Sequence, residues 1–254
     1  MKPAIHLRER LNSDQLTLGV LLTQALSLEL LEIAIEAGLD YVIVDCEHFD
    51  HGATRVAEVC AFGRRAGLAV ILRPARSDPD SIRVAMDLGP CGLLLPMIES
   101  AAQLDGVLQG AYMPPRGRRR PGGPGNRWVR QYDYSVFKTE VEDHLIVIPQ
   151  VESPEGLKNS DAIAAHPLTT ALGVGPFDLS ANLGVCWQPD HPKLCEALAN
   201  LRQSAARAGK PFWMIGDSGQ LTAQGYKFIC MGEPMMLLQA TLARMVSQLR
   251  QHGD

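Results

Sequence analysis

Short apolar runs alternate with helical patterns eight times along the 254 residues of this chain. Each run is rich in Val, Ile and Leu and stops at Gly, Pro or polar residues, a pattern typical of strands buried on both faces of a parallel sheet. Strands are expected at 17–22, 41–44, 69–72, 93–95, 145–148, 170–174, 211–215 and 227–230. The longer helices are expected at 28–37, 53–65, 79–88, 100–109, 192–208 and 234–250. Residues 1–16 form a polar lead-in.

This alternation predicts an α/β fold, and specifically a (β/α)8 TIM barrel formed by residues 1–254 as a single domain. Alternating units give parallel strands joined by right-handed crossovers, and barrels of this class commonly run to about 200–250 residues. An open doubly wound sheet is the alternative, but its usual G-x-G-x-x-G turn does not follow the first expected strand. No shift in composition marks a second domain.

Composition narrows the class of partner and the compartment. The net charge of -4 argues against nucleic acid or an anionic membrane surface as the main partner. The apolar runs are too short to span a bilayer, and residues 1–16 lack the apolar core of a signal peptide. The six cysteines show no C-x-x-C spacing, which favours buried thiols over disulfides or a zinc site. We therefore expect a cytoplasmic protein that acts on small molecules.

In such a barrel, functional side chains lie at the carboxyl ends of the strands. Glu152 and Asp178 follow two successive strands, and two carboxylates at one rim suit a hard cation such as Mg²⁺, which takes its other ligands from water and substrate. Each acid alone is also explained as a residue at a helix N-terminus, but their pairing favours a metal site. The polar residues at the strand ends are Asp45, Glu47, His48, Arg73, Gln150, Glu152 and Asp178.

The same rim indicates enolate chemistry. The chain has six lysines, none at the carboxyl end of an expected strand, which argues against a Schiff-base mechanism and leaves a metal-stabilised enolate. His48 suits proton transfer near neutral pH, and Arg73 suits a fixed cation at a developing enolate oxygen. Gly175-Pro176-Phe177-Asp178 opens a helix whose free backbone N–H groups can hold a substrate carboxylate.

The segment 114–127 is too rich in Gly, Pro and Arg for regular structure. Long loops of this kind in compact domains are usually functional or mobile. Two interpretations stay open. The loop either covers the site and offers cations to an anionic substrate, or lies in solvent or against another subunit.

The rim segments together resemble the metal-dependent pyruvate aldolases of the HpcH/HpaI aldolase/citrate lyase family. They occur in the order and at the spacing of that family over nearly the whole chain. The segments are Val44-Asp45-Cys46-Glu47-His48, Leu72-Arg73-Pro74, Asp87-Leu88-Gly89, Leu95-Pro96-Met97, Tyr112-Met113-Pro114-Pro115-Arg116-Gly117, Gln150-Val151-Glu152-Ser153, and Gly175-Pro176-Phe177-Asp178-Leu179-Ser180-Ala181-Asn182-Leu183-Gly184.

The resemblance implies a phosphoenolpyruvate/pyruvate-type barrel with a divalent metal ion, Mg²⁺, Mn²⁺ or Co²⁺, on Glu152 and Asp178. A 2-oxo acid would chelate the metal through its carboxylate and keto oxygens, and Gln150 would help to position it. Arg73 would stand at the developing enolate oxygen.

The resemblance further implies that His48 transfers protons, supported by Asp45 or Asp87. Family members are commonly hexamers that exchange their last helix with a neighbour, so we expect a homo-oligomer, a trimer or a hexamer. Such an exchange would account for the apolar residues 235–238.

The expected activity is that of a metal-dependent aldolase. It would cleave or form a 4-hydroxy-2-oxo acid, giving pyruvate or a close 2-oxo acid and an aldehyde. One alternative keeps the metal enolate but condenses it with oxaloacetate in a citrate-forming step. The other is a barrel that binds a 2-oxo acid without catalysis.

Overall fold

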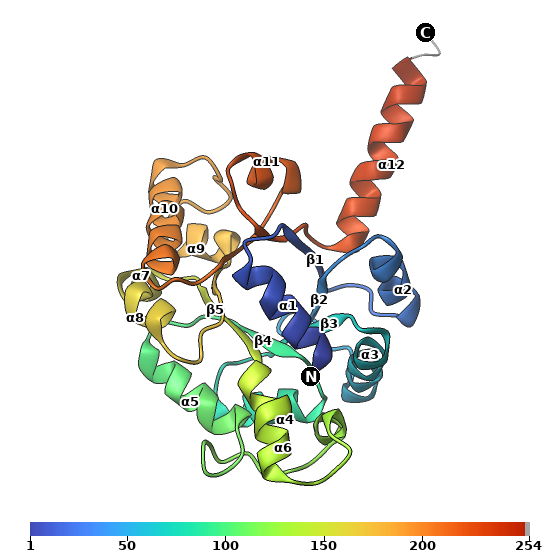
Figure 1. Cartoon of the computed structure of the whole chain (residues 1–254). Helices are drawn as coiled ribbons and strands as arrows, with labels where there is room; N and C mark the ends of the chain where they lie inside the picture. The colour runs from blue at the N-terminus through green and yellow to red at the C-terminus, as the bar shows by residue number, and fades with distance from the viewer. Residues whose placement is uncertain (252–254) are drawn as a thin grey trace.

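A computed structural model of the chain, which describes residues 1–251, shows eight parallel strands closed into a barrel in which each strand pairs with the next and β8 pairs with β1 (Figure 1). The predicted (β/α)8 fold is therefore confirmed. Residues 252–254 of the expected single domain lie outside the described residues. The strands are β1 (Thr17–Leu22), β2 (Tyr41–Asp45), β3 (Ala69–Arg73), β4 (Gly92–Leu95), β5 (Ile146–Val151), β6 (Leu172–Val174), β7 (Phe212–Ile215) and β8 (Phe228–Cys230).

Most helices lie outside the barrel and begin where the sequence supplies a cap. Ser27 and Asp78 accept hydrogen bonds from the first turns of their helices, and Ser100 forms a capping box with Gln103. The helices of the outer ring are α2 (Leu28–Glu36), α3 (Ala53–Ala66), α4 (Pro79–Asp87), α5 (Ala101–Ala111), α7 (Pro154–Lys158), α8 (Ser160–Ala165), α9 (Pro176–Asn182), α10 (Pro192–Arg207) and α11 (Ser218–Ala223).

Three short helical elements lie between α5 and β5. They are η1 (Pro124–Trp128), α6 (Tyr134–Glu140) and η2 (Glu142–His144). Residues 114–123 have no helix or strand, as the composition of segment 114–127 predicts. Residues 124–127 belong to the 3-10 helix η1, so for them the prediction is wrong.

The prediction that residues 1–16 form only a polar lead-in is wrong, because residues 2–12 form helix α1 (Lys2–Asn12). Ala4, Leu7 and Leu11 recur at helical spacing and are buried, although the charged residues between them hide this pattern. Arg8 donates to the carbonyl of Leu145, which directly precedes β5, over 2.9 Å. Helix α1 therefore covers the amino ends of the strands (Figure 1), so the opposite end is left for the polar rim.

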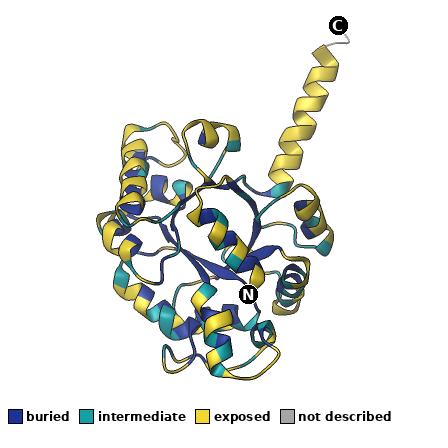
Figure 2. Ribbon diagram, in the orientation of Figure 1, coloured by how far each residue is buried: buried dark blue, intermediate teal, exposed yellow. Residues whose placement is uncertain are grey.

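The strands of the barrel are buried (Figure 2), and large side chains such as Trp213 and Tyr41 fill its interior. Trp213 of β7 donates from Nε1 to the Tyr41 hydroxyl of β2 over 3.0 Å, and both residues are buried. Gly19 leaves room for this arrangement, because a Cβ there would lie 2.5 Å from the Tyr41 ring. The interior is thus a packed core beneath the rim, as in other barrels of this class.

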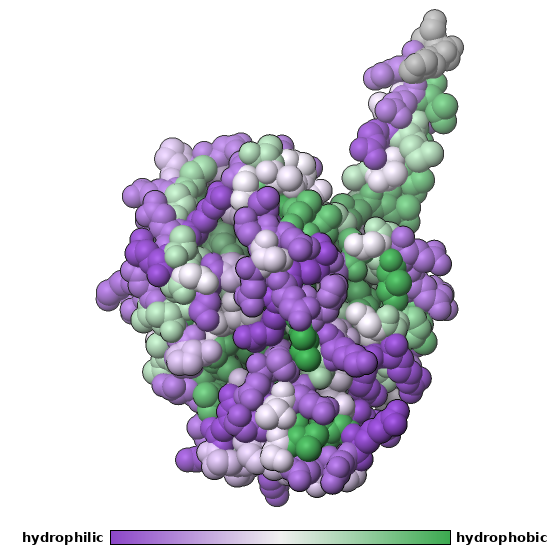
Figure 3. Space-filling model, viewed as in Figure 1, coloured by the Kyte–Doolittle hydropathy of each residue, from purple (hydrophilic) through white to green (hydrophobic). Residues whose placement is uncertain are grey.

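Helix α12 (Pro234–Gln251) projects away from its own barrel (Figures 1 and 2). None of its residues is buried, and apolar side chains form much of its surface (Figure 3). Within residues 1–251 no helix combines the length and apolar content that a membrane span requires. The exposed apolar residues of α12 are Met235, Met236, Leu237, Leu238, Leu242, Met245, Val246 and Leu249.

Candidate active site

Asp45 and Arg73 form a buried ion pair at the rim. They are register partners at the last positions of β2 and β3, and their side chains meet through Nε–Oδ1 and Nη2–Oδ2 bonds of 2.9 and 2.6 Å. Thr23, directly after β1, donates to Asp45 Oδ2 over 3.1 Å. Burial disfavours the charged carboxyl, but the Arg73 hydrogen bonds and charge outweigh it and lower the pKa of Asp45. Asp45 therefore fixes the orientation of the guanidinium.

Glu47 and His48 follow on the same strand end. Glu47 Oε2 lies 3.3 Å from Arg73 Nε and 3.7 Å from His48 Nε2. Burial raises the pKa of Glu47, with smaller contributions from the charges of Asp45 and Asp178, while Arg73 and His48 oppose the shift. The backbone N–H groups of Glu47 and His48 donate to Asp45 Oδ1, which anchors this turn.

Glu152 directly follows β5, and Asp178 lies in the first turn of α9 after β6, near enough to Glu152 for the two charges to repel. Glu152 is only 2% exposed, and its Oε2 accepts from the Met97 N–H over 2.7 Å. Burial, with added repulsion from Asp178 and Glu47, raises the pKa of Glu152 to about 7. Gly175 makes room for this carboxylate, because a Cβ there would lie 2.0 Å from Glu152 Oε1.

This acid pair fits a divalent cation. The region holds more carboxylates than cations, and their mutual repulsion is what a bound cation would relieve. Mg²⁺ and similar hard cations typically bind one or two protein carboxylates and take water and substrate oxygens as their other ligands. No group of three or more His, Cys, Asp or Glu side chains in residues 1–251 could hold a metal by itself, so Glu152 and Asp178 would leave positions open for a substrate.

Gln150 lies in β5 two positions before Glu152, and α9 begins directly after Gly175. Gln150 is 2% exposed, and its Oε1 is buried without a hydrogen-bond partner within the described part of the chain. A buried unpaired amide oxygen is costly unless a ligand or water fills the site. Pro176 begins α9 after Gly175, and Phe177 is exposed at the helix start. These positions remain predictions for substrate binding.

A family model described as HpcH/HpaI aldolase/citrate lyase matches residues 20–239, most of the chain. The chain belongs to the HpcH/HpaI aldolase/citrate lyase family.

Individual members of the HpcH/HpaI family agree with this assignment. A hydroxypyruvate/pyruvate aldolase of Pseudomonas aeruginosa is 29% identical and covers 98% of this chain and 94% of its own. A 4-hydroxy-2-oxo-heptane-1,7-dioate aldolase of Klebsiella pneumoniae is 30% identical over 82% of this chain and 80% of its own. The crystal structure of an HpcH/HpaI aldolase from Desulfitobacterium hafniense superimposes with a TM-score of 0.86 at 26% identity, covering 96% of each chain. The predicted family and aldolase class are confirmed.

Asp87, one of the two expected supports of His48 in this HpcH/HpaI barrel, pairs with a different residue. Its Oδ1 accepts from Arg119 Nε and Nη2 over 3.2 and 2.8 Å, and Arg119 is fully buried. Arg116 pairs with Glu142 and Asp143. Two of the loop arginines therefore fasten segment 114–127 to its own barrel, while Arg118, Arg120 and Arg127 remain exposed.

Sequence reasoning missed several contacts in the site. The Met97 N–H points at Glu152 because Met97 adopts a left-handed conformation, φ 52°, which no local pattern signals. Thr23 carried a usable signal, since it is the first polar residue after β1.

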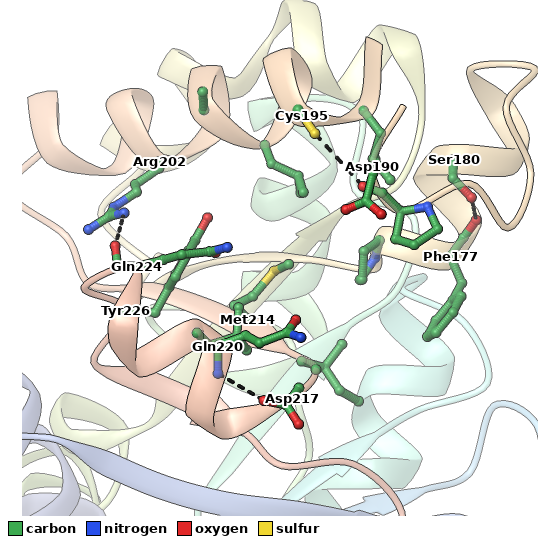
Figure 4. A pocket seen from close by; sticks show the side chains of 18 of the residues that line it. Phe177, Ser180, Asp190, Cys195, Arg202, Met214, Asp217, Gln220, Gln224 and Tyr226 are labelled. Carbon is green, nitrogen blue, oxygen red and sulfur yellow. Dashed lines mark hydrogen bonds between the residues drawn. The ribbon is translucent and has the colours of Figure 1, made fainter. Parts of the chain in front are cut away.

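A cavity of about 900 Å³ lies elsewhere, between α9, α10 and α11 (Figure 4). Met214 of β7 lines it, whereas the neighbouring Trp213 contacts Tyr41 inside the barrel. Because successive strand residues face opposite sides, this cavity is outside the barrel wall. Pro176 and Phe177 reach it, but Arg73 and Glu152 do not line it.

Proposed function

We propose that this protein is a divalent-metal-dependent aldolase that cleaves or forms 4-hydroxy-2-oxo acids, with pyruvate or a close 2-oxo acid and an aldehyde as the partners of the reaction. The observation that carries the proposal is the acid pair of the buried Glu152 and the exposed Asp178 on the same rim as the Asp45–Arg73 pair. The names of the family relatives support an aldol reaction over condensation with oxaloacetate. A barrel that only binds a 2-oxo acid would have no need of His48.

Each residue of the proposed site has a role in the reaction that suits the chemistry of its side chain. A divalent cation bound by Glu152 and Asp178 would polarise the keto oxygen of the 2-oxo acid and make its methyl group more acidic. Arg73, held by Asp45, offers a fixed cation to the charge that develops on that oxygen. His48 accepts or returns the proton, and Gln150 offers its buried amide to the 2-oxo acid.

The direct test is pyruvate formation from a 4-hydroxy-2-oxo acid by the purified protein. Metal-stripped protein should form none, and Mg²⁺, Mn²⁺ or Co²⁺ should restore the reaction. A protein that binds pyruvate and metal but cleaves no member of a panel of 4-hydroxy-2-oxo acids would refute the proposal.

Metal affinity should depend on pH. A carboxylate must lose its proton to bind a metal, and the pKa of Glu152 is raised to about 7 in the metal-free protein. Protons therefore compete below that pH, and the apparent affinity for Mn²⁺ should fall by up to about tenfold per pH unit on acidification. Calorimetric titration across this range measures the effect. An affinity that does not change from pH 6 to pH 8 (roughly one unit on either side of that pKa) would contradict it.

We also propose that the protein is a homo-oligomer, a trimer or a hexamer, assembled through α12. The apolar residues of this helix are not covered by its own barrel, and a surface of this kind marks an interaction site. Light scattering at micromolar concentration should give a multiple of the monomer mass, and a chain that ends at Glu233 should be smaller. A monomeric full-length protein would refute the assembly without affecting the catalytic site.

A further inference from the structure

We propose that Glu233 is a specificity-determining residue that accepts a hydrogen bond from a hydroxyl group of the aldehyde. This inference rests on the proposed function, because it assigns a residue to the second substrate of the aldol reaction. The preferred substrates are then neutral hydroxyaldehydes, in place of aldehydes that carry a carboxylate or have no hydroxyl group. Glu233 follows β8, where Gly232-Glu233-Pro234 leads into α12.

Glu233 lies at the carboxyl end of the barrel, where functional side chains of this fold are found. The Leu21 N–H of β1 donates to the Gly232 carbonyl over 3.0 Å, so the chain still pairs with β1 one residue before Glu233. Two positions beyond Leu21, Thr23 donates to Asp45 Oδ2 over 3.1 Å. Glu233 therefore stands near the level of the buried ion pair that Asp45 forms.

The end of β8 is also within the electrostatic reach of Arg73. Burial raises the pKa of the Cys230 thiol, the last residue of β8, to about 12, and the charge of Arg73 opposes that rise. Phe228, two positions earlier, contacts Tyr41 inside the barrel with ring centroids 5.0 Å apart. Because alternate residues of a strand share a face, Cys230 points to the same interior. A substrate bound at Arg73 would therefore lie close to the end of β8.

Only one of the two carboxylate oxygens of Glu233 has a hydrogen-bond partner in the part of the chain that the structure describes. Oε2 accepts from the Met236 N–H over 3.0 Å and so caps the start of α12. Oε1 is buried and has no partner among residues 1–251, and Glu233 as a whole is 8% exposed. A buried acceptor without a donor is costly. The cap accounts for Oε2, and a donor on the substrate accounts for Oε1.

The chemistry of this oxygen selects among aldehydes. A carboxylate oxygen accepts hydrogen bonds and donates none. A substrate hydroxyl group can donate to it, a methyl group cannot, and a substrate carboxylate adds a second negative charge without a donor. Glycolaldehyde, acetaldehyde and glyoxylate carry CH₂OH, CH₃ and COO⁻ groups next to the same aldehyde carbon, so they form a matched series. Glu233 should select glycolaldehyde from it.

The test measures kcat/KM for addition of pyruvate to these three aldehydes by the Mg²⁺-loaded protein. The wild type should prefer glycolaldehyde to acetaldehyde about 10–100-fold, the usual effect of a hydrogen bond to a charged group. Glu233→Ser keeps a good capping residue but removes Oε1, so this preference should disappear. Glu233→Gln should keep the cap through its amide oxygen and place NH₂ where Oε1 was, so the ratio of glyoxylate to glycolaldehyde should rise about tenfold or more. Glu58→Gln, on the exposed face of α3, is the matched control and should keep the wild-type ratios.

Exchange of the pyruvate methyl protons with D₂O separates this inference from the proposed function, because no aldehyde takes part in it. If the wild type exchanges these protons but the aldehyde ratios of Glu233→Ser and Glu233→Gln match its own, Glu233 is only the cap of α12 and the inference is overturned alone. Equal losses with all three aldehydes would overturn it in the same way. Should Glu233→Ser fail to fold, the glyoxylate ratio of Glu233→Gln decides. A folded wild-type protein that exchanges no methyl protons would overturn the proposed function as well.

Discussion

Replacing Arg73 by Lys is expected to lower aldol turnover about 10²–10³-fold, the usual cost of losing one preorganised donor at a developing oxyanion. The structure explains why so conservative a change is severe. Asp45 binds two different nitrogens of the guanidinium, whereas a single ammonium cannot span both oxygens and still face the substrate. The change also leaves a fully buried Asp45 with a weaker counter-ion. Exchange of the pyruvate methyl protons should slow in parallel, since it passes through the same enolate.

Two controls make the Arg73 result specific. Arg55→Lys, on the exposed face of α3, should leave turnover unchanged. His48→Ala should also slow cleavage, by roughly 10²–10⁴-fold, but it should keep the affinity for oxalate in the presence of metal, which Arg73→Lys should lose. Should His48→Ala lose oxalate binding while Arg73→Lys keeps it, the two roles are reversed.

Glu152→Gln is expected to remove metal binding at useful concentrations. At an effective dielectric of about 20, one pair of unit charges 4 Å apart is worth about 4 kcal/mol, or about 10³-fold in affinity, so loss of one carboxylate charge opposite a divalent ion should cost at least that much. Gln keeps the size of Glu and can still accept from the Met97 N–H, so the fold should survive. Asp178→Asn should have an effect of the same kind.

Calorimetric titration with Mn²⁺ measures this loss, and turnover should fall with it. Glu58→Gln makes the same chemical change on the surface of α3 and should bind metal as the wild type does. If Glu152→Gln retained wild-type metal affinity, the cation would have to bind elsewhere.

The strands of the barrel and the residues at their carboxyl ends could be predicted because the sequence pattern that marks each strand is local. Strand β5 ends at Val151, directly before Glu152, and β3 ends at Arg73, so parallel topology alone brings these residues to one edge. Helix α1 could not be predicted in the same way. Its buried residues alternate with charged ones, and only the open amino end of the barrel explains why it is a helix.

The contacts between rim side chains depend on geometry that the sequence does not specify. Asp87 and Arg119 are separated by 32 positions, and no pattern pairs them. The expected support of His48 by Asp45 or Asp87 came from resemblance, while the structure places both carboxylates on arginines. Glu47 was visible as a strand-end acid, but only side-chain distances connect it to both His48 and Arg73.

The proposed role of Glu152 and Asp178 is to hold the divalent cation on which the 2-oxo acid chemistry depends. Exchange of the pyruvate methyl protons in D₂O, with and without excess chelator, tests it most directly because it needs no knowledge of the aldehyde. We expect no exchange above background in chelator and full recovery when Mg²⁺, Mn²⁺ or Co²⁺ is added in excess. Undiminished exchange in excess chelator would contradict the assignment of the site.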